Sequence, residues 1–241
     1  MALAAVAGCG GGDGEALVQV RVLQLSTPAV LPRTVAGQPR VRVSAIAPAP
    51  TVAPALGSPA VQVPHVGSIS LGRPDRGRLV NGLQLPAAGL YWVTWDPILH
   101  QVPNRDGRRW GSDRLLEFLV AVLRDFHIAN PAAPPVVVGD LSRPFGGLFG
   151  TAYGGLGHAS HQNGLDVDVY YPRIDRAPRA PDRVRDVDRV LAQDLVDRFV
   201  AAGAQFAFVG SRVGLAGPPS VVQVIAHHND HVHVRIANAR R

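Results

Sequence analysis

The sequence predicts an α+β fold in which a central antiparallel sheet packs against flanking helices. Two segments place apolar residues at helical spacing, and several short segments alternate apolar and polar residues as strands do. A stretch rich in Pro, Ala and Val precedes all of them, and such composition is typical of an extended linker. We therefore divide the 241 residues into an N-terminal tether over 1–64 and a single folded domain over 65–241.

The N-terminal segment carries the chain's one cysteine, Cys9, so no disulfide can form within the chain. The sequence Val6-Ala-Gly-Cys9 resembles the bacterial lipobox, in which the cysteine becomes a lipidated N-terminus, although a basic segment before it is lacking. We expect a periplasmic protein that is anchored to a membrane through Cys9. Apolar alternations at 18–22 and 41–43 leave edge strands as an alternative to a tether.

The first expected helix follows a strand over 90–95. Ser112 is a typical helix N-cap, and Asp113 would lie in the first turn, where a negative charge is favoured. The segment that follows places one apolar stripe on the helix, and this stripe indicates a core-facing helix. The stripe consists of Leu115, Leu116, Leu119, Leu123 and Phe126.

The second half of the domain alternates strands with one more helix. Pro134-Pro135 ends any helix, and short strands are expected at 136–140 and 168–171. A helix is expected near 186–202, with Gly203 at its C-terminus. Its apolar side is predicted to contain Val187, Val190, Leu191, Leu195 and Phe199.

Three further strands are expected at 205–209, 221–225 and 231–236. Residues two apart in a strand face the same side. His231 and His233 should therefore project together, while Val232 and Val234 face the core.

Composition excludes several classes of function. The hydrophobic fraction of 46% and the charged fraction of 17% are ordinary for a globular domain, and no apolar run approaches the roughly 20 residues that span a bilayer. The net charge of +6 comes from arginine alone. These arginines are scattered without interleaved aromatic residues or a recognised binding motif, so we expect a solvated basic surface and no nucleic-acid partner.

Two histidine-rich stretches, 158–168 and 227–233, contain six of the nine histidines. Imidazole and carboxylate groups at such spacings are ligands that zinc prefers. Asn163-Gly164 permits a turn that brings Asp168 back toward His161, and His233 would add a second nitrogen. Three protein ligands leave a fourth position for water, whose pKa zinc lowers to about 7, and this is the chemistry of amide hydrolysis.

The chain lacks the His-Glu-x-x-His motif, and neither of its two glutamates lies near the histidines, so another group must move the proton. His231 is the candidate general base because it faces the same way as His233, and His228 would support it. His158, Asp166 and Asp230 are candidates for groups that orient the ligands or add to them.

At these residues the chain resembles the penicillin-insensitive murein endopeptidases, within the wider lysostaphin, D-Ala-D-Ala peptidase and hedgehog-like group of zinc peptidases. The resemblance runs from about Gly67 to Ile236. The two histidine motifs are shared by the wider group, and the flanking motifs indicate the endopeptidases. Those flanking motifs are Ser68–Gly72, Gly77–Gly82 with Leu85-Pro86, Trp110-Gly111, and Gly139–Pro144 with Gly146-Gly147.

The resemblance implies one zinc ion per chain, held by His161, Asp168 and His233, with catalysis assisted by His231 and His228. The implied substrate is the peptide cross-link of peptidoglycan, between D-alanine and meso-diaminopimelate on neighbouring peptide stems. Arginine suits the carboxylates of such a substrate, and Arg143 is the candidate.

The chain departs from the family pattern in two places. The residues before His228 are Val-Ile-Ala-His, where the family usually has bulky aromatic groups, so one wall of the cleft should differ. The chain also cannot form the disulfides of members that carry several cysteines.

Three alternatives stay open at this point. A D,D-carboxypeptidase or dipeptidase of the same zinc group has a similar first motif but normally a glutamate-bearing second motif, which is absent here. A non-catalytic peptidoglycan-binding zinc domain would close the fourth position with another ligand, such as His158 or His228. Asp194 and Asp197 offer a second metal site, against the simpler interpretation of a solvated helix face.

Overall fold

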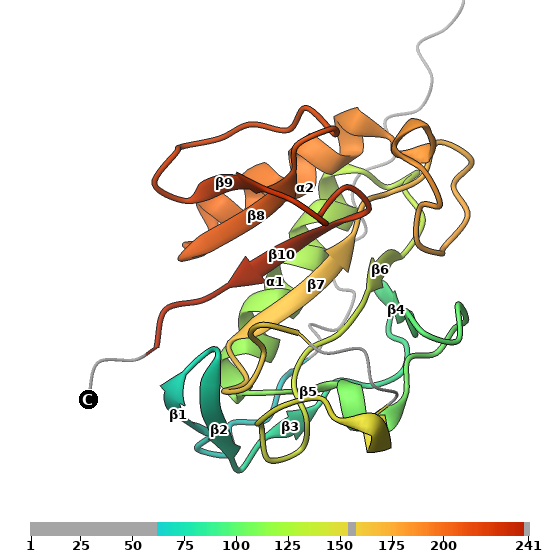
Figure 1. Cartoon of the computed structure of the whole chain (residues 1–241). Coiled ribbons are helices and arrows are strands. Elements are labelled where there is room, and N and C mark those ends of the chain that lie inside the picture. The colour runs from blue at the N-terminus through green and yellow to red at the C-terminus, as the bar shows by residue number, and fades with distance from the viewer. Residues whose placement is uncertain (1–61, 154–157, 239–241) are drawn as a thin grey trace, which may run out of the picture. The chain divides into compact units, whose positions relative to one another are not determined.

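The computed structural model describes residues 62–153 and 158–238. Its centre is a six-stranded sheet (Figure 1). In spatial order the strands are β4 (Trp92–Thr94), β6 (Val136–Val138), β7 (Asp166–Tyr170), β10 (His231–Arg235), β8 (Phe206–Gly210) and β9 (Val222–Ile225). The expected α+β architecture and the expected strands are confirmed, with shifts of one or two residues at their ends.

The sheet is mixed, which corrects the prediction of an antiparallel sheet. The inner pairs, from β6 through β7 and β10 to β8, are antiparallel, whereas β4 pairs with β6 and β8 with β9 in parallel. Parallel neighbours need a long crossover connection. The chain supplies one through the helix α1 (Asp113–Ala129), between β4 and β6, and another through the loop over 211–221.

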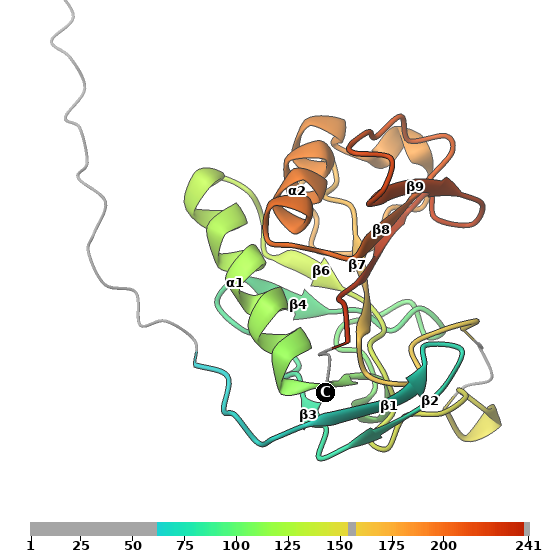
Figure 2. The same cartoon turned by 90° about the vertical axis from the view of Figure 1, so that its left-hand side faces the viewer.

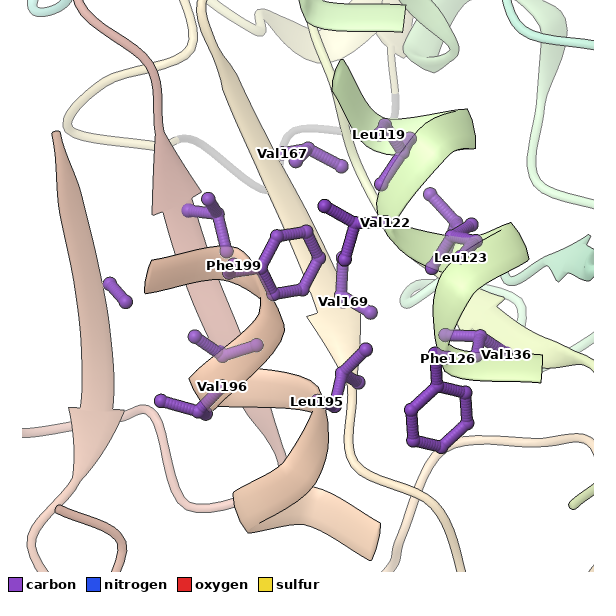
Figure 3. Packing of buried hydrophobic residues seen from close by; sticks show 14 of the residues in the cluster. Leu119, Val122, Leu123, Phe126, Val136, Val167, Val169, Leu195, Val196 and Phe199 are labelled. Carbon is purple, nitrogen blue, oxygen red and sulfur yellow. The ribbon is translucent and has the colours of Figure 1, made fainter. Parts of the chain in front are cut away.

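Both helices, α1 and α2 (Arg189–Ala201), lie on the same side of the sheet (Figure 2). The strands contribute Val167 and Val169 from β7 and Val232 and Val234 from β10, all fully buried, to the core that the helices cover. Figure 3 shows this packing, with Leu123 and Phe199 facing the strand side chains. The alternate residues of β7 and β10 therefore face the opposite side of the sheet.

The start of α1 is as predicted. The hydroxyl of Ser112 accepts a hydrogen bond from the backbone N–H of Leu115 at 3.2 Å. Asp113 is buried, and its carboxylate accepts hydrogen bonds from the backbone N–H groups of Val66, Gly67 and Ser68 at 3.0–3.2 Å. This carboxylate thereby ties the start of the described chain to the helix N-terminus.

The second helix begins at Arg189, and Asp188 caps it by accepting a hydrogen bond from the N–H of Leu191. Val190 is 79% exposed, so its predicted place on the buried side is wrong. The helix buries Leu191, Ala192, Leu195, Val196 and Phe199 instead. Gly203, with φ +90°, follows the helix end as expected.

Two small sheets flank one end of the six-stranded sheet. The hairpin of β1 (Ile69–Arg73) and β2 (Arg76–Val80) is antiparallel, and β3 (Leu83–Gln84) pairs with β5 (Trp110–Gly111). Short 3-10 helices lie at Asp106–Arg108, Thr151–Tyr153 and Val184–Asp186. Within the described ranges, neither α-helix combines the length and the apolar character needed to cross a bilayer.

Most of the expected tether, including Cys9 and the alternations at 18–22 and 41–43, lies outside the described residues. Within them, Val63 packs against the main core.

Candidate metal centre

The pairing of β7 with β10 builds the centre. In their antiparallel register His233 lies directly opposite Asp168, and Arg235 lies opposite Asp166. The valines on either side of these residues face the helices, so His233 and Asp168 share the other face of the sheet. The prediction that His231 and His233 project together is confirmed.

His161 reaches the same face from the loop before β7. The loop turns through His161, with φ +70°, and Gly164, with φ +72°. Two hydrogen bonds fix Gln162 beside them, from its N–H to the carbonyl of Pro74 at 2.9 Å and from the N–H of Gly147 to its carbonyl at 2.8 Å. The imidazole Nδ1 lies 2.7 Å from the carbonyl oxygen of Leu141, to which it donates, leaving Nε2 free to face Asp168.

The residues predicted to bind the metal converge on one point. His161 Nε2 lies 3.2 Å from His233 Nδ1, and Asp168 Oδ1 lies 3.1 Å from His233 Nδ1 and 3.4 Å from His161 Nε2. Tetrahedral zinc with bonds of about 2.0–2.1 Å separates its ligand atoms by about 3.3–3.4 Å. Asp168 Oδ1 is also buried without a hydrogen bond, although buried polar atoms are normally paired. The donor set and this unsatisfied oxygen fit a zinc ion.

The far ring nitrogen of His233 is held by Asp166. The distance from Nε2 to the Oδ1 of Asp166 is 2.8 Å, and the same oxygen accepts a hydrogen bond from Arg235 Nε at 2.6 Å. A carboxylate bonded to the outer nitrogen of a metal-binding histidine fixes its tautomer and orientation. Asp166 has the place expected of such a group.

His158 joins the group as well. Its ligand atom and those of His161 and Asp168 all lie within 4.8 Å of one another, and its Nδ1 is 3.7 Å from Asp168 Oδ2. Its Nε2 lies 2.7 Å from Asp140 Oδ2. The outer nitrogens of all three histidines thus have oxygen partners, and His158 is a candidate fourth ligand as well as an orienting group.

Sequence reasoning missed the buried pair of Arg108 and Asp140 beneath His158. The guanidinium of Arg108 is fully buried, donates to both carboxylate oxygens of Asp140, and lies 4.4 Å from the ring centroid of Phe149. Burial opposes ionisation of Asp140, but the hydrogen bonds from Arg108 and His158 outweigh it and lower its pKa. A carboxylate directly after a buried strand is the signal that the sequence offered for this residue.

The two predicted catalytic histidines lie at the edge of the same group. His231 Nδ1 is 2.8 Å from Asp230 Oδ1, and its Nε2 is 3.7 Å from Asp168 Oδ1. The ring of His228 lies 4.7 Å from that of His231, and its Nδ1 donates to the carbonyl of Ala226 at 2.6 Å. The structure therefore brings every predicted histidine of the site together.

Burial and charge set the protonation of the centre in opposite directions. Burial lowers the pKa of His161, and an unprotonated imidazole is the form that binds metal. Burial also opposes charge on Asp168 and His233. The nearby His161 and His231 nevertheless hold the pKa of Asp168 well below its usual value, and the carboxylates of Asp166 and Asp168 beside the ring raise the pKa of His233 to about 9. A proton and a metal ion compete for His233 Nδ1.

A cleft of roughly 720 Å³ opens over these groups. The tip of the β1–β2 hairpin forms one wall, and Ile225 and His227, in the segment where the chain departs from the family pattern, lie in another. Arg143 is not among the described residues that line the cleft. Its guanidinium lies 4.3 Å from the ring centroid of Tyr153 and donates to the carbonyl of Leu148, so it braces its own loop.

Comparison with known proteins agrees with this centre. A family model described as penicillin-insensitive murein endopeptidase matches residues 70–206, which include the first histidine-rich stretch and precede the second. A protein of that name from Klebsiella pneumoniae subsp. pneumoniae is 39% identical over 72 residues, 30% of this chain and 24% of the relative. Another, from Escherichia coli O1:K1 / APEC, is 35% identical over 100 residues, 41% of this chain and 32% of the relative.

The chain spans no more than about a third of the length of these curated relatives. The family model, however, matches more than half of the chain and covers the elements from β1 to the start of β8, including His158, His161 and Asp168. On this evidence the chain belongs to the penicillin-insensitive murein endopeptidase family.

Proposed function

We propose that the chain is a zinc metallo-endopeptidase that hydrolyses D-alanyl to meso-diaminopimelate cross-links in peptidoglycan. One observation carries the proposal. His161 Nε2, Asp168 Oδ1 and His233 Nδ1 lie within 3.4 Å of one another at the floor of an open cleft. Of these atoms, Asp168 Oδ1 is buried and has no hydrogen bond. Family membership supports the substrate.

A bound zinc ion supplies Lewis-acid chemistry, because it polarises a carbonyl oxygen and acidifies water. The protein supplies the proton transfer. Asp230 holds Nδ1 of His231, so Nε2 is the nitrogen left to take a proton from water and to return it to the departing amine. His228, whose ring adjoins that of His231, lines the cleft beside it.

A purely structural zinc site is the second candidate, and the place of His158 favours it. With Nδ1 3.7 Å from Asp168 Oδ2, His158 offers a fourth protein ligand, and four protein ligands are typical of structural zinc. Its outer nitrogen is already bonded to the Arg108–Asp140 pair, which suits a ligand as well as an orienting group.

The first experiment is metal analysis of the purified protein combined with digestion of peptidoglycan and mass analysis of the products. We expect about one zinc per chain and conversion of cross-linked muropeptide dimers to monomers. Release of free D-alanine from pentapeptides would instead indicate the carboxypeptidase. Zinc-loaded protein that leaves the dimers intact, beside an active reference enzyme, would contradict the proposal.

Substitution of His231 separates catalysis from structure. His231→Ala should keep its zinc and lose cleavage by about 100-fold or more, since general acid–base catalysis contributes 10²–10⁴-fold. His127→Ala is the matched control, because His127 lies on α1 on the far side of the sheet. If the site is structural, His158→Ala should lose zinc, and neither the parent protein nor any of the variants should cleave the cross-link.

We also propose a periplasmic location with a lipid anchor at Cys9, which rests on the lipobox-like sequence alone. Labelling of the protein in cells with a fatty-acid analogue tests it. Incorporation should disappear in Cys9→Ser, and a label that persists in this variant, or is absent from the parent, would contradict the anchor.

A further inference from the structure

A second pocket, of roughly 550 Å³, adjoins the cleft. It is lined by the segment over 181–185 and by Arg212, His227, Asn229 and Asp230. His227 lines both this pocket and the cleft, so this residue, next to His228, is a shared wall. The volume lies in the usual range for small-ligand sites and exceeds what a single ion needs.

The charge of this pocket is strongly one-sided. Arg183, Arg185 and Arg212 are exposed, and within the described part of the chain none of their guanidinium groups makes an ion pair or a side-chain hydrogen bond. Two other exposed arginines have carboxylate partners, Arg73 with Asp75 and Arg176 with Asp188. Three unpaired guanidinium groups around one concavity create a positive potential that favours an anion.

The two carboxylates in the pocket do not neutralise these arginines, because both have other partners. Asp182 Oδ2 lies 2.6 Å from Arg179 Nη1 and 3.3 Å from Arg173 Nη1. The hydrogen bond from Arg179 is the main cause of the lowered pKa of Asp182. The Asp182 carboxylate therefore stays ionised and paired with Arg179 and Arg173. Asp230 is bonded to His231.

We propose that this pocket, here called the arginine pocket, binds a free carboxylate of the peptidoglycan stem whose cross-link lies in the cleft. This inference rests on the proposed function. A cross-linked dimer carries several carboxylates within a few residues of the scissile bond. The forked donors of arginine match a planar carboxylate better than the point charge of a lysine ammonium does. The shared wall at His227 lets one extended peptide occupy both sites.

The consequence is a substrate preference that the zinc ligands cannot provide. Stems whose carboxylate is free should bind better than stems in which it is amidated, because the amide loses the charge that guanidinium recognises. Arg143, the candidate from sequence, braces its own loop, and the arginine pocket supplies the cationic groups that such a substrate needs.

The test measures binding of two uncleavable stem tetrapeptides, identical except that one carries a carboxylate where the other carries a carboxamide. Calorimetric titration of the zinc-loaded protein should show the carboxylate form binding about tenfold or more tightly. The double variant Arg185→Gln/Arg212→Gln should lose this preference. Arg189→Gln, which removes an exposed arginine outside the arginine pocket, should keep it.

Equal affinity for the two peptides in the parent protein, or an unchanged preference in the double variant, would overturn the assignment. Inorganic phosphate is the second probe, and if it binds as tightly as the carboxylate peptide, the pocket is a general anion site and the assignment fails. Because neither peptide is cleaved, the measurement is independent of activity. A protein that shows the preference and leaves cross-links intact would refute the endopeptidase alone.

Discussion

Asp166 shows how a residue outside the metal-binding group supports it. Its carboxylate is fully buried and accepts from both His233 Nε2 and Arg235 Nε. Asp166→Asn removes the charge that holds the imidazole, so zinc affinity should fall by about 10–100-fold. Competition with a chromophoric chelator measures this. Asp125→Asn, at an exposed aspartate on α1, is the control; equal affinity in the two variants would show that Asp166 does not position His233.

Asp113 gives a prediction about acid stability. Burial raises the pKa of Asp113, but hydrogen bonds from backbone N–H groups, among them those of Ser68 and Arg114, outweigh it and hold the pKa below its usual value. A depressed folded-state pKa stabilises the protein above the unfolded value, near 3.9, and this contribution is lost as the pH falls through the folded value.

Asp113→Asn should therefore lower the free energy of unfolding by a constant amount above about pH 5, on the order of 1–3 kcal/mol for hydrogen bonds to a charged group. The difference from the parent should shrink below about pH 4. Denaturant titrations at several pH values measure it. A difference that grows on acidification would have the wrong sign for this account.

At the residue scale the sequence predicted what depends on chemistry and short spacing. His161, Asp168 and His233 follow from ligand preference and strand alternation. The contact of Arg108 with Asp140 could not be predicted, because it joins a short 3-10 helix to the segment after β6 across 32 residues and depends on tertiary packing. Nor could helical spacing alone exclude Val190 from the buried side of α2, because the exact start of the helix decides which side its first turn faces.

The helix α2 allows a direct test of that correction. Leu195 is fully buried in the main core, whereas Val190 is 79% exposed. Leu195→Ala should lower the free energy of unfolding by about 2–5 kcal/mol through lost burial and a cavity. Val190→Ala should change it by less than about 0.5 kcal/mol. Similar losses in both variants, measured by denaturant titration, would mean that α2 is rotated from the described position.

The loop around Gly146 positions the segment that carries His161. Gly146 has φ +69°, and a Cβ there would lie 2.1 Å from the carbonyl oxygen of Gln162. Gly146→Ala should therefore destabilise the protein by more than about 1 kcal/mol and weaken zinc binding, because the loop must shift. A Cβ on Gly150 meets no atom within 4 Å, so Gly150→Ala is the matched control. Thermal unfolding and chelator competition compare the two variants. If Gly146→Ala changed neither stability nor zinc affinity, the close contact between Gly146 and the carbonyl of Gln162 would be contradicted.

At the scale of elements, the six strands of the main sheet were predicted from the sequence, whereas their direction and the short strands of the two small sheets were not. Alternation along a strand is the same in either direction, so Val136–Val138 and Val222–Ile225 gave no sign of parallel neighbours. Direction is set by the length and path of the connections. The helix α1 provides one such path.

For the whole molecule, the metal-binding residues link distant parts of the chain. His161 and His233 are 72 positions apart and meet only in the folded state. Zinc should therefore stabilise the fold, by about 2.7 kcal/mol at a free concentration one hundred times its dissociation constant. A chelator should lower the unfolding temperature of the parent, and His233→Ala should be insensitive to it. An unfolding temperature of the parent that does not change when zinc is removed would count against a site formed by folding.

The register of β7 against β10 also constrains how this domain can change over evolution. Asp168 and His233 meet because they are cross-strand partners, and a shift of one residue in either strand would turn one of them toward the helices. A single-residue insertion or deletion within either strand should therefore separate these two residues and abolish metal binding, whichever residue is inserted or removed. The connection over 211–221, between β8 and β9, carries no such restriction, and relatives should differ most in length there.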